Sequence, residues 1–201
     1  MESAVFLQGM GLGASLIIAI GTQNAFLLRQ GLLGKYVLSC TLICIACDVL
    51  LIAAGVAGMG GLISAQPALL LWIKVAGAVF LLVYGARAAL AAWRPGTLQA
   101  GAAAAPASHG AVVAAAFAFS LLNPHVYLDT VILLGSIGGQ QAGAGRFYFA
   151  AGAMLASAIW FTGLGYGARF LAPLFARPFA WRVLDGVIAL VMWTIAWSLF
   201  H

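Results

Sequence analysis

Two aspartates, Asp48 and Asp129, lie inside long apolar stretches of the chain. A carboxylate at the centre of a bilayer costs roughly 2.5–3.5 kcal/mol, so it marks a site for a cation or a proton, or it pairs with a base on another helix. For Asp48 the candidate base is Lys74, and this structural pairing is the alternative to a binding role. A third aspartate, Asp185, stands three residues after Arg182, which predicts a local ion pair on one helix.

The pair Asn123-Pro124 stands six residues before Asp129. Proline lacks an amide hydrogen and clashes with the preceding turn, so the carbonyl of Ser120 loses its usual donor. Such a carbonyl is tolerated at membrane depth only inside protein or against a water-filled cavity. The pattern predicts a helix broken at this point, with Tyr127 and Asp129 as site residues beyond the break. The alternative is a kink that serves packing only.

Two amides, Gln23 and Asn24, follow Gly21 near the end of the first apolar stretch. Each amide offers donors and acceptors, so together they can hold both ends of an amino acid. Hydrogen bonds between helices are the alternative role.

Three cysteines, Cys40, Cys44 and Cys47, share one face of a predicted helix. The Cys-x-x-Cys spacing of the last two could form a redox pair. Packing as small apolar side chains is the interpretation we favour, because no second Cys pair or nearby His completes a metal site. No metal or other cofactor is expected.

The composition shows which elements must position these residues. The chain has 201 residues, of which 65% are hydrophobic and only 6% are charged. Soluble domains carry about a quarter charged residues, so this chain cannot cover a surface that faces water. The net charge of +5 comes from basic residues scattered singly at the ends of apolar runs. That distribution is an orientation signal of a membrane protein and does not indicate a nucleic-acid partner.

A membrane-spanning helix needs about 20 mostly apolar residues. Six stretches meet this condition, at about 4–28, 37–57, 67–90, 111–135, 147–170 and 181–200. An Ala- and Gly-rich linker at 94–110 separates a first set of three spans (1–93) from a second (111–201). Because three is odd, the second set enters the membrane upside down relative to the first, as in many transporters whose site lies between inverted repeats. We therefore predict an all-α integral membrane protein whose six transmembrane helices form two inverted three-helix repeats, together one transport domain.

Orientation follows from the Lys and Arg residues in the loops. Seven of them fall in the first, third and fifth connections, and two fall on the other side: Arg29, Lys35, Arg87, Arg94, Arg169, Arg177 and Arg182 against Lys74 and Arg146. This excess places the first group in the cytoplasm and both termini in the periplasm.

Short motifs containing these polar residues are spread along both halves. They are Gly21–Gly31, Asp48 with Gly55–Gly58, Tyr84-Gly85, Leu122–Thr130, Leu134–Gly138, Gly165–Arg169 and Trp181–Asp185. With these motifs the sequence resembles the bacterial basic amino-acid exporters of the lysine exporter (LysE-type) family, which include the arginine exporters. The resemblance covers essentially the whole chain and is most specific in the run from Asn123 to Thr130.

The resemblance implies export of L-lysine, L-arginine or related cationic amino acids across a bacterial inner membrane, driven by the membrane potential or a proton gradient. It also implies that Asp48 and Asp129 matter for transport. The expected partners are a basic amino acid, a proton or other coupling ion, and membrane lipid, and a homodimer is left open. The predicted substrate- or ion-binding residues are Gln23, Asn24, Asp48, Asn123, Pro124, Tyr127 and Asp129.

Other activities are left open as alternatives. One is an exporter of neutral amino acids or small cations, although a metal cation would favour clustered His, Cys or carboxylate ligands. A membrane redox enzyme using Cys44 and Cys47 is another. We expect a transporter and no enzyme activity.

Overall fold

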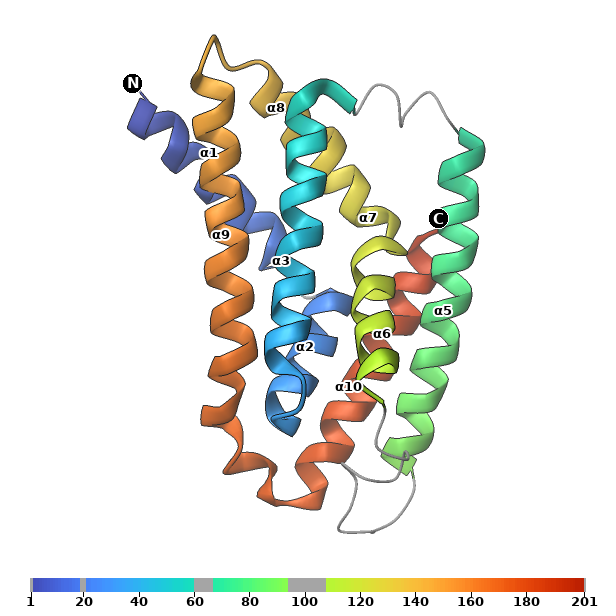
Figure 1. The fold of residues 1–201 in the computed structure, drawn as a ribbon. Helices are drawn as coiled ribbons and strands as arrows, with labels where there is room; N and C mark the ends of the chain where they lie inside the picture. Colours follow the sequence, from blue (N-terminus) through green and yellow to red (C-terminus); the bar gives the residue numbers. More distant parts are fainter. Residues whose placement is uncertain (1, 19–20, 60–66, 94–107, 201) are drawn as a thin grey trace.

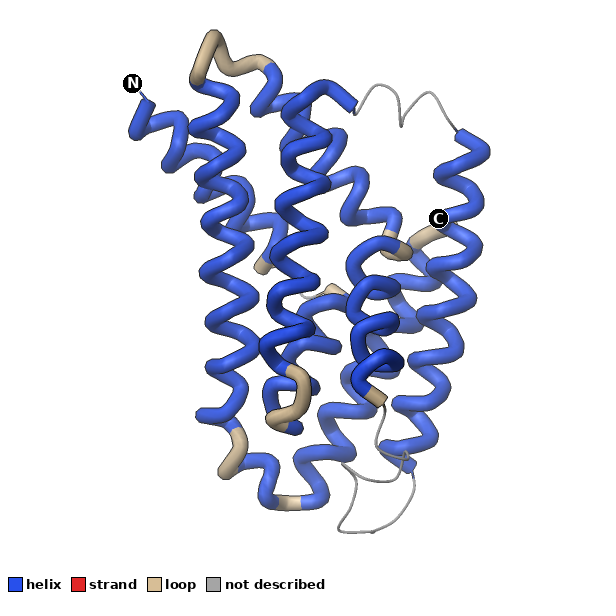
Figure 2. Tube along the Cα trace, in the orientation of Figure 1, coloured by secondary structure: helices blue, strands red, loops and turns tan. Residues whose placement is uncertain are grey.

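The computed structural model describes residues 2–18, 21–59, 67–93 and 108–200. Every regular element in these ranges is a helix (Figure 2). Four helices are long and apolar enough to cross a membrane, and two bent helix pairs raise the number of spans to as many as six. The prediction of an all-α integral membrane protein is confirmed.

The helices form an upright bundle (Figure 1). In chain order the elements are α1 (Glu2–Ile17), α2 (Thr22–Leu33), α3 (Val37–Ala54), η1 (Gly55–Met59), α5 (Pro67–Trp93), α6 (His109–Leu121), α7 (Pro124–Val126), η2 (Tyr127–Leu134), α8 (Gly135–Gly139), α9 (Gly145–Gly167), η3 (Ala168–Leu171), η4 (Leu174–Ala176) and α10 (Pro178–Ser198). The second, third, fifth and sixth predicted spans agree with these bounds to within a few residues.

The fourth predicted span is broken at the expected place. The helix α6 ends at Leu121, and the segment from Pro124 to Gly139 leaves it at an angle of 52°. Between them Asn123 is extended, with φ −90° and ψ 108°. A residue before proline is disfavoured in the helical region, so Pro124 forces this conformation on Asn123. The predicted break is confirmed.

The first predicted span is not one helix, and the expectation of a continuous span over 4–28 is wrong. The helices α1 and α2 lie at 80° to each other. The residue before α2, Gly21, is extended, with φ −117° and ψ 172°. The Asn24 side chain donates to the carbonyl of Ile17 over 2.8 Å, and so supplies a partner for a carbonyl at the end of α1. No proline marks this break, so the sequence did not reveal it.

Long-range packing brings elements from the two halves of the chain together. The helix α1 packs along α9, α5 packs along α10, and the end of α3 with η1 packs against η2 and α8. The last crossing is close, since a Cβ atom added to Gly135 would lie 2.6 Å from backbone atoms of Gly55. Elsewhere in the bundle, the aromatic rings of Phe26, Phe80 and Tyr84 surround that of Phe119. We call these four residues the aromatic cluster.

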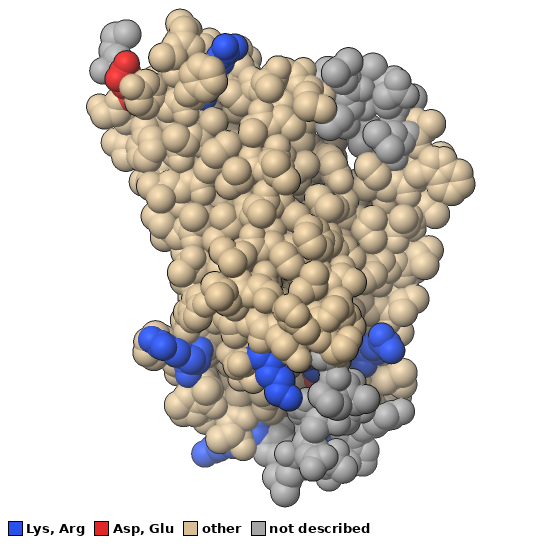
Figure 3. Space-filling model, in the orientation of Figure 1, with Lys and Arg blue, Asp and Glu red and all other residues tan. Residues whose placement is uncertain are grey.

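Basic side chains gather at one end of the bundle, where α9 ends and α10 begins (Figure 3). The helix α1 starts at the opposite end, and α10 runs toward that end. The orientation of the termini was predicted from the distribution of Lys and Arg residues, and it stays a prediction. Most of the predicted linker, residues 94–107, lies outside the described residues.

Candidate functional site

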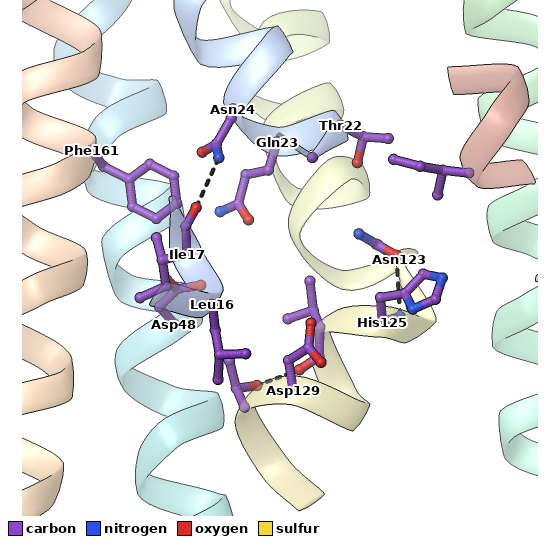
Figure 4. A pocket seen from close by; sticks show the side chains of 14 residues that line it. Leu16, Ile17, Thr22, Gln23, Asn24, Asp48, Asn123, His125, Asp129 and Phe161 are labelled. Atoms are coloured by element: carbon purple, nitrogen blue, oxygen red, sulfur yellow. Dashed lines mark hydrogen bonds between the residues drawn. The ribbon is translucent and has the colours of Figure 1, made fainter. Parts of the chain in front are cut away.

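A cavity of about 260 Å³ lies between elements of the two halves, where both broken spans meet. Pockets for drug-sized ligands measure roughly 300–1,000 Å³, so this one suits a molecule the size of an amino acid. It is lined by Leu16, Ile17, Gly21, Thr22, Gln23, Asn24, Asp48, Asn123, His125, Val126, Asp129, Thr130, Phe161 and Ile195 (Figure 4). Five of the seven predicted site residues are therefore brought together: Gln23, Asn24, Asp48, Asn123 and Asp129.

The carboxylate of Asp48 is the most buried charged group in the cavity wall, at 3% exposure. It lies on α3, and its Oδ2 accepts a hydrogen bond of 2.8 Å from the Ser157 hydroxyl of α9. The proposed structural partner Lys74 does not pair with it. Among the described residues the one ion pair within 4 Å joins Arg29 to Asp185. The alternative of an Asp48–Lys74 pair is therefore wrong in this structure.

The second carboxylate, Asp129, projects from η2 on the opposite wall (Figure 4). The element η2 is a π-helical segment that begins directly after α7, in the part of the fourth span beyond the break. Single π-helical turns inside α-helices occur frequently at functional sites. The half-buried Asp129 thus faces a cavity that also holds Asp48, although the two residues are 81 positions apart in the sequence.

Around the second break, the predicted residues take different positions. The Asn123 side chain lines the cavity, and its Oδ1 accepts a hydrogen bond from the backbone N–H of His125 over 3.2 Å, which caps α7. Neither Pro124 nor Tyr127 belongs to the lining. The Tyr127 hydroxyl instead donates to the carbonyl of Leu121 over 2.9 Å. This bond spans the break, so Tyr127 holds the bent shape of the wall.

At the first break the two neighbouring amides have different surroundings. Asn24 donates to Ile17 and accepts a hydrogen bond of 3.1 Å from Trp160 Nε1, so both ends of its amide are engaged within the protein. By contrast, Gln23 Nε2 makes no hydrogen bond with the described residues, although Gln23 is only 8% exposed. The hydroxyl of Thr22, which is fully buried, also finds no hydrogen-bond partner among the residues that the structure describes. The hydrogen bonds of Asn24 fit the alternative of a structural role. The missing partner of Gln23 Nε2 fits a binding role.

Sequence reasoning missed several residues of the site. Thr22 was overlooked beside the two amides, and nothing in the sequence connects Ser157 to Asp48. His125 also lines the cavity, and its Nε2 lies 3.3 Å from the Ser198 hydroxyl. The predicted local pair of Asp185 with Arg182 is also wrong, because Asp185 pairs with Arg29 from α2 at 3.3 Å.

The two aspartates give the cavity an acidic lining. Among the described residues that line it, two are aspartates and none is Lys or Arg. Carboxylates at membrane depth are kept where they bind a cation or a proton or pair with a base, and no base pairs with these two in the described part of the chain. The wall also offers amide, hydroxyl and imidazole groups that can orient a polar molecule.

Comparisons with known proteins agree with this chemistry. Residues 14–201 match the protein family described as LysE type translocator. A protein of Mycobacterium tuberculosis that has the provisional name of an amino-acid transporter is 45% identical over 182 residues, which cover 90% of each chain. The arginine exporter protein ArgO of Yersinia enterocolitica is 41% identical over 196 residues, 98% of this chain and 96% of its own. The ArgO protein of Pectobacterium carotovorum is 42% identical over the same shares. No solved structure matches the chain.

Proposed function

Since the chain belongs to the LysE type translocators, a family of transporters and not of enzymes, we propose that it exports arginine and related basic amino acids from the cytoplasm across a bacterial inner membrane. The names of its ArgO relatives support the substrate and the direction. The described helices support a protein that crosses the membrane several times.

The substrate class is inferred from the cavity, whose two aspartates form no ion pair with the described residues. A basic amino acid has two cationic groups and one carboxylate. Asp48 and Asp129 can each receive one cationic group, because both face the same cavity and neither pairs with a protein cation within 4 Å among the described residues. A neutral amino acid has a single ammonium group and would leave one buried carboxylate without a partner, which is costly in a membrane.

The packing of the helices supports transport by two inverted repeats. The spans of each half can be numbered one to three in chain order. The contact of α1 with α9 then joins span one of the first half to span two of the second half. The contact of α3 with η2 and α8 joins span two of the first half to span one of the second half. The third spans, α5 and α10, pair with each other. A two-fold axis in the membrane plane would produce these three pairings. Movement of one repeat against the other would then expose the central cavity to either side.

The energy source follows from the charge of the substrate. A potential that is negative inside opposes the exit of a net single positive charge by about 2.3 kcal/mol per 100 mV. The membrane potential alone therefore cannot drive export of a monovalent cation. We propose that entry of at least one proton, the coupling ion, accompanies each exported amino acid.

Export by the purified protein in liposomes tests this function. Liposomes loaded with labelled arginine, lysine or alanine are diluted into substrate-free buffer, with and without an inward proton gradient. We expect the protein to accelerate the efflux of arginine and lysine but not of alanine, and we expect a proton-conducting uncoupler to reduce the gradient-driven part. Equal efflux from protein-containing and empty liposomes would overturn the transport proposal, and equal rates for alanine would overturn the basic substrate class.

A further inference from the structure

We infer that the first turn of α2 is the subsite for the substrate's α-carboxylate, with the side chains of Thr22 and Gln23 as its donors. This inference rests on the proposed function, and it assigns one part of the cavity to one end of the substrate. Asp48 and Asp129 are left to hold the two cationic groups, the α-ammonium and the side-chain cation.

The position of α2 supplies the first argument. This helix of 12 residues begins at the cavity wall, where Gly21, Thr22 and Gln23 all contribute to the lining. The residue that precedes it, Gly21, has no side chain that could cap the helix. The first N–H groups of a helix have no partner within the helix. Together with the helix dipole they attract anions, and broken helices in transporters present such ends to the carboxylates of their substrates.

Two buried side chains at the same place supply the second argument, which is independent of the helix end. In the described part of the chain, Gln23 Nε2 and Thr22 Oγ1 have no hydrogen-bond partner, although Gln23 is 8% exposed and Thr22 is fully buried. The Cys44 thiol lies beside Gln23, but a thiol is only a weak hydrogen-bonding group. Buried polar groups in folded proteins nearly always have partners, and an exception at a cavity wall points to a ligand.

The direction of Gln23 agrees with this role. Figure 4 shows its side chain extending into the space between α3, which carries Asp48, and η2, which carries Asp129. Both donors come from the wall of α2, whereas both carboxylates come from other elements. A bound basic amino acid would therefore be oriented, with its α-carboxylate at α2 and its side-chain cation directed away from α2.

We assign a structural role to Asn24. Its amide already forms hydrogen bonds to Ile17 and Trp160, and these bonds connect α2 to the end of α1 and to α9. It positions the subsite and is not a donor to the substrate.

Selectivity for the carboxylate is the measurable consequence. Agmatine is arginine without its carboxylate, and arginine methyl ester keeps the α-ammonium group but masks the carboxylate charge. In proteoliposomes that exchange labelled arginine, we expect both compounds to compete at least tenfold more weakly than arginine, the loss typical of a missing hydrogen bond to a charged group. Wild-type protein alone suffices for this measurement. If agmatine and the ester compete as well as arginine does, the subsite is refuted while the proposed function stands, and absence of any arginine exchange refutes the proposed function itself.

Variants identify the residues of the subsite. We expect Gln23→Ala and Thr22→Val to weaken arginine competition about tenfold but to leave agmatine competition unchanged, so that the preference for arginine shrinks. The matched control is Thr41→Val, because Thr41 is also buried with an unpartnered hydroxyl but does not line the cavity. It should keep the wild-type preference. An equal loss for arginine and agmatine in Gln23→Ala would assign Gln23 to the cationic end or to the shape of the cavity, and would refute its role as a carboxylate donor.

Discussion

Removal of Arg29 should destabilise the protein strongly, because it leaves the Asp185 carboxylate charged and buried without a partner. The Arg29 side chain is 23% exposed and that of Asp185 is 3% exposed, with Nε and Oδ1 3.3 Å apart. At this distance and an effective dielectric constant of about 20, the attraction is about 5 kcal/mol. Removing one partner of a buried pair typically costs about 3–5 kcal/mol, and the partial exposure of Arg29 favours the lower value.

The three variants Arg29→Leu, Asp185→Leu and the double substitution separate the charge effect from packing. Arg29→Leu should lose about 3 kcal/mol, and at about 2–4 °C per kcal/mol this lowers the melting temperature by roughly 10 °C. Asp185→Leu should lose less, since Arg29 can turn its guanidinium to water. The double variant should be more stable than Arg29→Leu, because no buried charge remains.

Thermal unfolding of the purified protein in detergent, followed by the fraction that stays monodisperse, measures these losses. Arg182→Leu is the matched control, because it removes a basic residue three positions before Asp185 that forms no ion pair with any described residue. It should melt as the wild type does. A wild-type melting temperature for Arg29→Leu, or losses in the single variants that simply add in the double variant, would refute the argument.

Three further outcomes are expected. Asp48→Asn should abolish arginine export in liposomes. Protein yield in the membrane should stay near wild type, because asparagine can still accept the hydrogen bond from Ser157. Loss of the protein from the membrane would instead indicate that the charge of Asp48 is structural. Pro124→Ala should slow export per molecule of inserted protein several-fold, since it lifts the restriction that keeps Asn123 extended; unchanged export per molecule would show that the break needs no proline. A reporter active only in the periplasm should be active when fused after residue 201, and activity of a cytoplasmic reporter there would contradict the orientation taken from the Lys and Arg residues.

The sequence was sufficient for the features that depend on composition and on proline. Apolar stretches of about 20 residues identify membrane spans because lipid demands them, whatever the tertiary packing. Likewise Pro124 breaks a helix through its own covalent structure, so the break can be read from one residue. The aspartates could be selected as candidate site residues because a carboxylate at membrane depth is costly and therefore needs a binding or pairing role.

Features created by packing could not be predicted in this way. The break before α2 contains no proline, and it depends on Asn24 reaching back to Ile17 and across to Trp160. The partners of Asp48 and Asp185 lie 109 and 156 positions away, on helices that only the fold brings near. Proximity in sequence suggested Arg182 for Asp185, but the tertiary pairing of α2 with α10 supplied Arg29 instead.

The two breaks have unlike chemistry, and this difference bears on how a small molecule can be oriented. At the first break the wall presents donors, from Thr22, Gln23 and the start of α2. At the second it presents Asn123 and, one helical segment later, the carboxylate of Asp129. Two repeats with identical side chains would give the cavity equivalent walls, and an amino acid would bind equally well in two opposite directions. Because the two breaks carry different side chains, one wall suits an anion and the other a cation, so a single orientation of a basic amino acid is favoured.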